Sequence, residues 1–258
     1  MHLPTGQSRR ARTLRSACRT LLTAVTLALA AAPAHSTENP AWSAALAEGR
    51  YQSGRGNLTL ALDALGAAER AATTPAQRAT AAGELGAALA QARRYDEADV
   101  QLRRAYDLST GAARARYAAD LGNVAALRKR NRDAERYFAE ARAAATSAEA
   151  KTAIDLNLAR LAPVNERLAS LDSVYRDIER LSDSPAKARL YLNLGIQARA
   201  LGNAGVPLAY RSLDAARGLL RPTGDSREWV DTLDALAQLY EDQGRDRKST
   251  RLNSSHRL

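Results

Sequence analysis

The sequence contains a single cysteine, a single methionine and a single phenylalanine, with only three histidines in 258 residues. The cysteine is Cys18, and the histidines are His2, His35 and His256. Residues 36–245 therefore contain neither a thiol nor an imidazole. This excludes a disulfide, a thiolate nucleophile and a zinc–thiolate site from that segment.

Other signatures of enzymes are lacking as well. No P-loop or dinucleotide-binding fingerprint occurs, and no carboxylate pair lies in a Gly-rich or strand-like context. The sequence thus predicts no catalytic residue, no cofactor-binding residue, no metal ligand and no enzymatic activity. Runs of β-branched residues are absent and proline is sparse, whereas Ala, Leu and Arg dominate. That composition favours an all-α fold.

The formal net charge of +10 is concentrated at the two ends of the chain. Five arginines and no acid occur in the first twenty residues, and four basic residues with one acid occur in residues 246–258. The body between them carries only about two net positive charges. A nearly neutral body lacks the basic surface that binds phosphate backbones, so we expect no nucleic-acid partner.

The N-terminal segment has the features of a secretory signal peptide. A basic stretch precedes the apolar run "TLLTAVTLALAAAPA", which ends in Ala32-Pro33-Ala34. Small residues at these positions are typical of a cleavage site, so residues 1–34 are predicted to be removed and the protein to be periplasmic or secreted. The apolar run is shorter than a membrane span of about 20 residues, and no span is expected after cleavage. The alternative is an uncleaved anchor.

Two segments of the body share one spacing of glycine, alanine and large apolar residues. Leu-Gly is followed after twelve residues by Ala, then by Leu or Phe, then by Ala, in residues 79–112 and again in residues 115–148. The positions are Leu85, Gly86, Ala98, Leu102 and Ala105 in the first copy and Leu121, Gly122, Ala134, Phe138 and Ala141 in the second. Two copies 36 residues apart indicate an internal repeat.

This pattern resembles the tetratricopeptide repeat, a pair of antiparallel helices. The resemblance implies that Gly86 and Gly122 lie where the paired helices approach closely, with Leu102 and Phe138 filling the space between them. Weaker copies are predicted at residues 42–75, 152–185 and 188–222, separated by prolines that include Pro75, Pro185 and Pro222. Because one helix pair cannot bury its apolar face alone, residues 35–245 are predicted to form an α-solenoid.

The chain begins one more repeat at residues 230–245 and does not complete it. Leu236-Ala237 occupies the Leu-Gly position and Gly244 the turn, but the residues that follow carry no second apolar helix. Residues 246–256 resemble an in-frame translation of a common sequencing adapter, so residues 246–258 are predicted to be a non-native tail on an N-terminal fragment. We expect an uncovered apolar stripe of Leu233, Leu236 and Tyr240 to promote self-association.

The order of these parts also resembles secreted bacterial proteins in which tetratricopeptide repeats precede a caspase-like CHAT domain. The segments that carry this resemblance are "LGNVAALRKRNRDAERYFAEARAAA", "LNLARLA", "LSDSPAKARLYLNLG" and "TLDALAQLYEDQGR". The resemblance implies that a peptidase domain, with its His and Cys, would lie beyond this sequence. The alternative is the repeat region of a polysaccharide-export protein.

The predicted function is a scaffold that binds a protein or peptide partner along the groove formed by the first helices. The residues expected to line this groove are Asn123, Asn157, Arg189, Asn193 and Arg199. The family resemblance places Asn123, Asn157 and Arg189 where some members hold a peptide's C-terminal carboxylate. The alternative is that these asparagines form hydrogen bonds between neighbouring helices.

Overall fold

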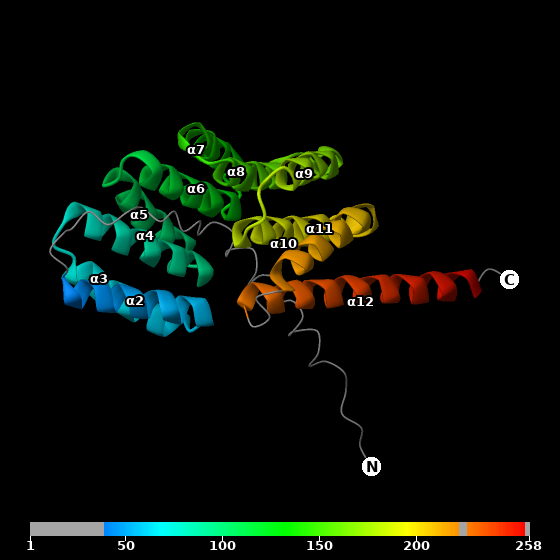
Figure 1. The fold of residues 1–258 in the computed structure, drawn as a ribbon, viewed down its shortest axis with the longest axis horizontal. Helices are drawn as coiled ribbons and strands as arrows, with labels where there is room; N and C mark the ends of the chain where they lie inside the picture. The colour runs from blue at the N-terminus through cyan, green and yellow to red at the C-terminus, as the bar shows by residue number, and fades with distance from the viewer. Residues whose placement is uncertain (1–38, 222–225, 256–258) are drawn as a thin grey trace, which may run out of the picture. The chain divides into compact units, whose positions relative to one another are not determined.

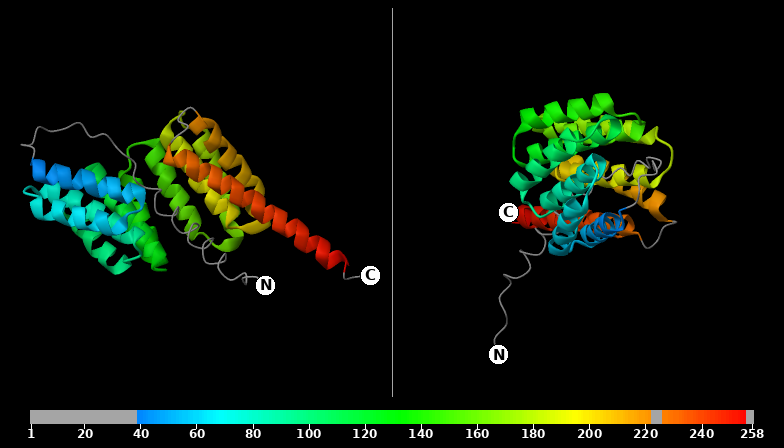
Figure 2. Two further views of the ribbon diagram at one scale, coloured as in Figure 1. Left: turned by 90° about the horizontal axis from the view of Figure 1, so that it is seen from below. Right: turned by 90° about the vertical axis from the view of Figure 1, so that its left-hand side faces the viewer.

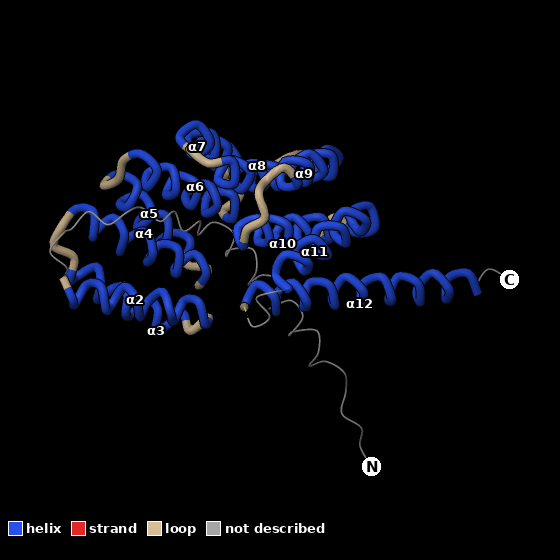
Figure 3. The backbone as a smooth tube through the Cα atoms, viewed as in Figure 1, coloured by secondary structure: helices blue, strands red, loops and turns tan. Residues whose placement is uncertain are grey.

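The computed structural model describes residues 39–221 and 226–255, and their side chains as far as Gly244. These ranges are almost wholly helical and contain no strand (Figure 3). The helices are α2 (Pro40–Arg55), α3 (Leu58–Ala71), α4 (Pro75–Gln91), α5 (Tyr95–Asp107), α6 (Gly111–Leu127), α7 (Asn131–Ala144), α8 (Ala148–Leu161), α9 (Val164–Glu179), α10 (Pro185–Arg199), α11 (Val206–Leu220) and α12 (Arg227–Ser255), with a short 3₁₀ helix, η2 (Gly202–Gly205). Among them, none is both long enough and apolar enough to cross a membrane. The predicted all-α class is confirmed.

The helices form antiparallel pairs, and the chain divides into two compact units after Leu161. In unit 1, the pairs α2/α3, α4/α5 and α6/α7 stack one on the next, and α8 packs against α7 (Figure 1). In unit 2, α10 and α11 form a pair that packs against α9 and α12. This is the architecture of an α-solenoid of helix pairs, as predicted.

In the helix pairs, a small residue of the first helix faces a large side chain of the second helix at close range. We call the position of the small residue the slot. A Cβ atom added at Gly86 would lie 2.7 Å from Leu102 Cγ, and one added at Gly122 would lie 2.6 Å from Phe138 Cε1. The facing large side chain follows the glycine by sixteen residues in both pairs. Any side chain at the slot would push the two helices apart. The close approach predicted at these two glycines is therefore confirmed.

Two further pairs repeat the same contact. Gly49 faces Leu65 at a distance of 2.5 Å from the built Cβ to Leu65 Cγ, and Gly195 faces Leu213 at 2.6 Å. The sequence analysis placed a weaker copy at residues 42–75 but did not identify Gly49 as its slot. Leu213 follows its glycine by eighteen residues, and the two additional residues fall in the turn that contains η2.

The turn between paired helices has one left-handed residue, always seven positions after the slot. These residues are Gly56, Arg93, Lys129 and Gly202, with φ between 60° and 77°. Glycine adopts this conformation without steric cost, whereas Arg93 and Lys129 bear the strain of a Cβ atom there. The helix pairs share the slot contact and the left-handed turn as well as the apolar pattern. They are therefore copies of one structural unit.

Prolines and capping side chains begin several of the helices. Pro75 and Pro185 stand at the first position of α4 and α10, where no intrahelical hydrogen bond is lost. Thr74 and Gln77 form a reciprocal capping box before α4, and Ser184 Oγ accepts from the backbone of Lys187 at 3.1 Å. The predicted boundary at Pro222 lies outside the described residues.

The repeat predicted at residues 152–185 is divided between the two units. Its first helix, α8, closes unit 1, and its second helix, α9, opens unit 2 after the break at Pro163. Within unit 2, α9 packs against α10, and Leu171 and Ile178 of α9 are buried. The ring centroid of Tyr175 on α9 lies 5.5 Å from that of Tyr191 on α10.

The end of α12 differs from the prediction in two respects. The turn expected at Gly244 is absent, since α12 continues as one helix to Ser255 and extends beyond α10 and α11 (Figures 1 and 2). In the described residues, no apolar second helix follows α12, so no packing favours a turn at Gly244. A glycine inside a helix lowers stability by only about 1 kcal/mol, so the helix can continue through it. In addition, Leu236 is buried on α12, which packs against α10 and α11. The exposed stripe is instead Val230, Leu233, Ala237 and Tyr240.

Candidate functional site

The candidate site of unit 1 lies on the first helices of its repeats, α2, α4, α6 and α8. We call the surface on which these helices adjoin one another the first-helix face. Its polar residues occur at fixed offsets from the slot, which in α8 is Ala159. One row of residues lies two positions before the slot and consists of Glu84, Asp120 and Asn157. The other row lies one position after the slot and consists of Arg50, Asn123 and Arg160. Both rows run across the stacked repeats.

Glu84 joins three successive first helices. Its Oε1 atom accepts a hydrogen bond from Arg50 of α2 at 2.9 Å and from Arg116 of α6 at 3.0 Å. Burial alone would raise the pKa of Glu84, but the guanidinium groups of Arg116 and Arg50 outweigh it and hold the pKa below its ordinary value. Glu84 is therefore a structural anion, satisfied by its two arginines in the free protein.

Asp120 is a largely buried carboxyl group on the same face. Burial raises its pKa to about 7, the charge of Arg116 opposes this rise, and the charge of Glu84 adds to it. Arg116 directs its Nη2 atom to Glu84 rather than to Asp120. Among the described residues, no basic nitrogen lies within ion-pair distance of the Asp120 carboxylate. Asp120 thus differs from Glu84 in that the charge of Arg116 acts on it without a hydrogen bond or an ion pair, and burial outweighs that charge.

A group of hydrogen-bond donors lies at α6 and α8. Arg160 donates from Nη2 to Asn123 Oδ1 at 3.3 Å, and no acidic side chain of the described residues forms an ion pair with it. Burial lowers the pKa of Arg160. Asn157, one turn earlier on α8, is only 4% exposed, and its Nδ2 atom has no hydrogen-bond partner. These groups present a guanidinium and amide N–H donors with no acid to satisfy them, which is an arrangement suited to a carboxylate.

The five residues predicted for the groove fall into two sets. Asn123 and Asn157 belong to unit 1 and lie on adjoining first helices, where Asn123 also makes the interhelical hydrogen bond that was the alternative prediction. Arg189, Asn193 and Arg199 lie along α10 in unit 2.

Both arginines of α10 face acidic side chains of α12. Arg189 lies 3.5 Å from Glu228, and Arg199 lies 3.5 Å from Asp242, whereas Asn193 is buried. Their charges are compensated, so they are weaker candidates for an anionic ligand than Arg160.

The sequence-based prediction missed Glu84, Arg116, Asp120 and Arg160. Three of them could have been found by counting from the slot, because Glu84 and Asp120 precede it by two residues and Arg160 follows it by one. Arg116 has no such signal, because it meets Glu84 only through the length of its side chain.

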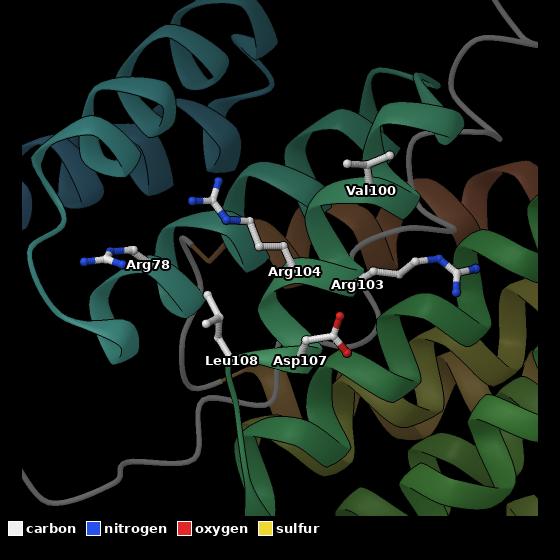
Figure 4. A pocket seen from close by; sticks show the side chains of 6 residues that line it. All are labelled: Arg78, Val100, Arg103, Arg104, Asp107 and Leu108. Carbon is white, nitrogen blue, oxygen red and sulfur yellow. The ribbon is translucent and has the colours of Figure 1, made fainter.

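A second surface feature is a shallow depression of 470 Å³ on α4 and α5. It is lined by Arg78, Val100, Arg103, Arg104, Asp107 and Leu108 (Figure 4). Its three guanidinium groups are already engaged: Arg78 bonds the backbone oxygen of Thr73, Arg103 bonds Asp99, and Arg104 bonds Glu69. The depression is therefore a weak candidate for an anion site, because its guanidinium groups already donate to other oxygen atoms.

In residues 39–221 and 226–255, no group of three or more His, Cys, Asp or Glu side chains could hold a metal ion.

No protein-family model matches the chain, and none of the curated proteins matches it. Among solved structures, the chain is similar to YrrB, described as a TPR protein with an unusual peptide-binding site. The likeness covers 78% of this chain and all of that chain, at 19% identity and a TM-score of 0.38.

A likeness at that score adds nothing to the packing described above. The slots, turns and stacked pairs of the protein themselves define the class: an all-α solenoid of antiparallel helix pairs.

Proposed function

We propose that the protein is an interaction scaffold that holds an extended peptide by its C-terminal carboxylate on the first-helix face of unit 1. One observation carries the proposal. Asn157 and Arg160 are donors withdrawn from water, one without a hydrogen-bond partner and the other without an acid. A buried donor left unsatisfied costs free energy that a bound carboxylate would recover. The folded body has no catalytic role in this proposal.

The test is fluorescence anisotropy with a labelled hexapeptide of alternating alanine and serine, supplied with a free C-terminal carboxylate or with a C-terminal amide. The acid should bind at least tenfold more tightly, the equivalent of about one charge-assisted hydrogen bond. Arg160→Gln should abolish the preference. Arg70→Gln removes the same charge from an exposed position on α3 and should leave the preference intact. Equal binding of acid and amide would contradict the proposal.

The site of action in this proposal is outside the cytoplasm, because residues 1–34 have the features of a secretory signal. The adapter-like residues 246–256 support the further proposal that a longer native protein continues beyond Arg245. A CHAT-type peptidase domain or a polysaccharide-export barrel would each use the repeats to recruit a partner. Sequencing the locus past Arg245 distinguishes them, since only the peptidase would add a His and Cys pair.

Self-association through α12 is also part of the proposal. Val230, Leu233 and Tyr240 are 59%, 41% and 58% exposed, and with Ala237 they recur at intervals of three and four residues along one side of the helix. This side contains the slot position Ala237, which no second helix of the described residues covers. Sedimentation equilibrium should show dimers that Leu233→Glu disrupts, whereas Asp234→Lys, also on the exposed surface of α12, should leave them intact.

A further inference from the structure

Asp120 lies on the first-helix face between two interhelical hydrogen bonds. On α6, Arg116, Asp120 and Asn123 are spaced four and three residues apart, so they share one side of the helix. Arg116 at one end bonds Glu84 of α4, and Asn123 at the other end bonds Arg160 of α8. Both neighbours are first helices. The carboxylate of Asp120 must therefore face the same surface as the donors of α8.

The environment of this carboxylate is unfavourable to its charge. Arg116 is the nearest cation, but its Nη2 atom is committed to Glu84. No other basic side chain of the described residues forms an ion pair with Asp120. A carboxylate whose burial outweighs the attraction of the nearby Arg116 lowers the stability of the folded state when it is ionised. Such violations of the rules of burial are typical of functional positions.

Asp120 is linked along α6 to the group of donors on α8 through Asn123. Asn123 follows Asp120 by three residues, which places their Cβ atoms about 5–6 Å apart. Arg160 bonds Asn123 directly, and Asn157 lies one turn from Arg160 on α8. The first-helix face thus carries, on the adjoining helices α6 and α8, a carboxylate that forms no ion pair and a guanidinium that forms no ion pair.

We propose that Asp120 receives the ammonium or guanidinium group of the last residue of a bound peptide, so that the site selects C-terminal lysine or arginine. The inference rests on the proposed function, because the carboxylate of that same residue binds at Asn157 and Arg160. One terminal residue then satisfies both charges at once. A residue with an uncharged side chain satisfies only the donors.

This arrangement makes binding depend on pH in a defined direction. Arg116 on its own helix and Glu84 from α4 are the charged groups that act on Asp120, and Arg160 of α8 forms no ion pair with it. Because the pKa of Asp120 is raised to about 7, part of the population is protonated at neutral pH. A bound cation favours the ionised form. The affinity for a basic terminus should therefore rise between about pH 6 and pH 8, as Asp120 loses its proton.

The experiment uses the full chain and three labelled hexapeptides of alternating alanine and serine. One ends in lysine with a free carboxylate, one ends in norleucine with a free carboxylate, and one ends in lysine amide. At pH 8 the lysine acid should bind about tenfold more tightly than the norleucine acid, as for one charge-assisted hydrogen bond. At pH 6 the ratio should shrink towards one, while the norleucine acid binds equally at both values.

Two variants complete the test. Asp120→Asn should equalise the lysine and norleucine acids without weakening the norleucine acid, and circular dichroism would establish that the variant is folded. Asp63→Asn makes the same change at an exposed position on α3 and should preserve the tenfold ratio.

The outcomes separate this inference from the proposal on which it rests. Equal affinity for the lysine and norleucine acids at pH 8, with the amide binding weakly, would overturn the role of Asp120 and leave the carboxylate site standing. Binding of the lysine amide as tightly as the lysine acid would overturn the carboxylate site. Failure of all three peptides to bind would overturn both.

Discussion

Gly122 in unit 1 and Ala237 in unit 2 occupy the same position of the repeat, yet only one of them is covered. Phe138 of α7 closes over Gly122 and is itself fully buried, whereas Ala237 on α12 is exposed. Each is followed seven residues later by the turn position, which is Lys129 in the first case and Gly244 in the second. The chain turns at Lys129 and continues as a helix through Gly244.

The comparison teaches that the second helix, rather than the turn residue, decides whether a repeat forms. Gly244 is better suited to a left-handed turn than Lys129, because it has no Cβ atom. The chain nevertheless turns only where an apolar face, such as that of Phe138, follows to cover the slot. Burial of that face outweighs the local preference of the turn residue, as tertiary packing commonly outweighs propensity.

The largest expected effect comes from filling the closed slot. Gly122→Leu should lower the free energy of unfolding by about 3 kcal/mol, because even a Cβ atom would lie 2.6 Å from the Phe138 ring. Ala237→Leu makes a similar substitution in the open slot, where nothing covers the side chain, and should change stability by less than about 0.5 kcal/mol. Urea denaturation of both variants measures the difference. Similar effects at the two positions would show that Ala237 does not occupy the same slot.

A smaller effect on the free energy of unfolding is expected from a substitution of Asp120 on the first-helix face. Asp120→Asn should stabilise the protein at pH 8 by about 2 kcal/mol, an estimate reduced for the partial exposure of this side chain. The pKa of this carboxyl group is about 7 in the folded state against an ordinary value of 3.8, so the folded state binds the proton more tightly. Stability of the wild-type protein therefore falls as pH rises from about 4 to about 7, and the advantage of the variant should vanish near pH 4.

Unfolding in urea at pH 4.5 and pH 8 provides the measurement for Asp120→Asn. Asp63→Asn, on the exposed surface of α3, serves as the control and should show no such dependence. If Asp120→Asn destabilised the protein equally at both values, the carboxylate would have a favourable partner in the folded state, and its proposed availability to a ligand would be wrong.

The smallest effect is expected at the part of α12 that lies beyond the packed helices. Deleting residues 246–258 should change the free energy of unfolding by no more than about 0.5 kcal/mol, because the described part of this segment extends past α10 and α11 (Figure 1). Thermal and urea unfolding of the shortened chain would measure this. A larger loss would mean that the segment packs on the array, and the contrast between closed and open slots would need revision.

The helix pairs could be predicted because they rest on small and apolar residues at fixed spacings. Gly86 and Gly122, with Leu102 and Phe138, define the contact in the sequence as clearly as in the structure. The division after Leu161 could not be predicted in this way. The pattern of α8 and α9 matches one repeat, and a break at Pro163 is compatible both with a turn inside a repeat and with a boundary between units.

The candidate site was less predictable for a different reason. Periodicity identifies which positions are buried, but the hydrogen bonds between polar side chains depend on which neighbours they reach. Asn123 and Asn157 were found from the resemblance, whereas the significance of Asp120 depends on the hydrogen bond by which Arg116 joins Glu84 rather than Asp120. The prediction of a turn at Gly244 was wrong for a related reason. It relied on the turn residue alone and did not require a following apolar helix.

Glu84 has a consequence for the way in which unit 1 comes apart. In a stack of repeats, each element normally interacts only with its nearest neighbours, and melting can begin at an end and proceed one element at a time. The single Glu84 carboxylate bonds both Arg50 of α2 and Arg116 of α6, so it contributes to the interfaces on both sides of its own repeat. Fraying of the N-terminal pair then removes a cation from the bond that holds the third repeat to the second. The first three repeats are thereby coupled into one cooperative block.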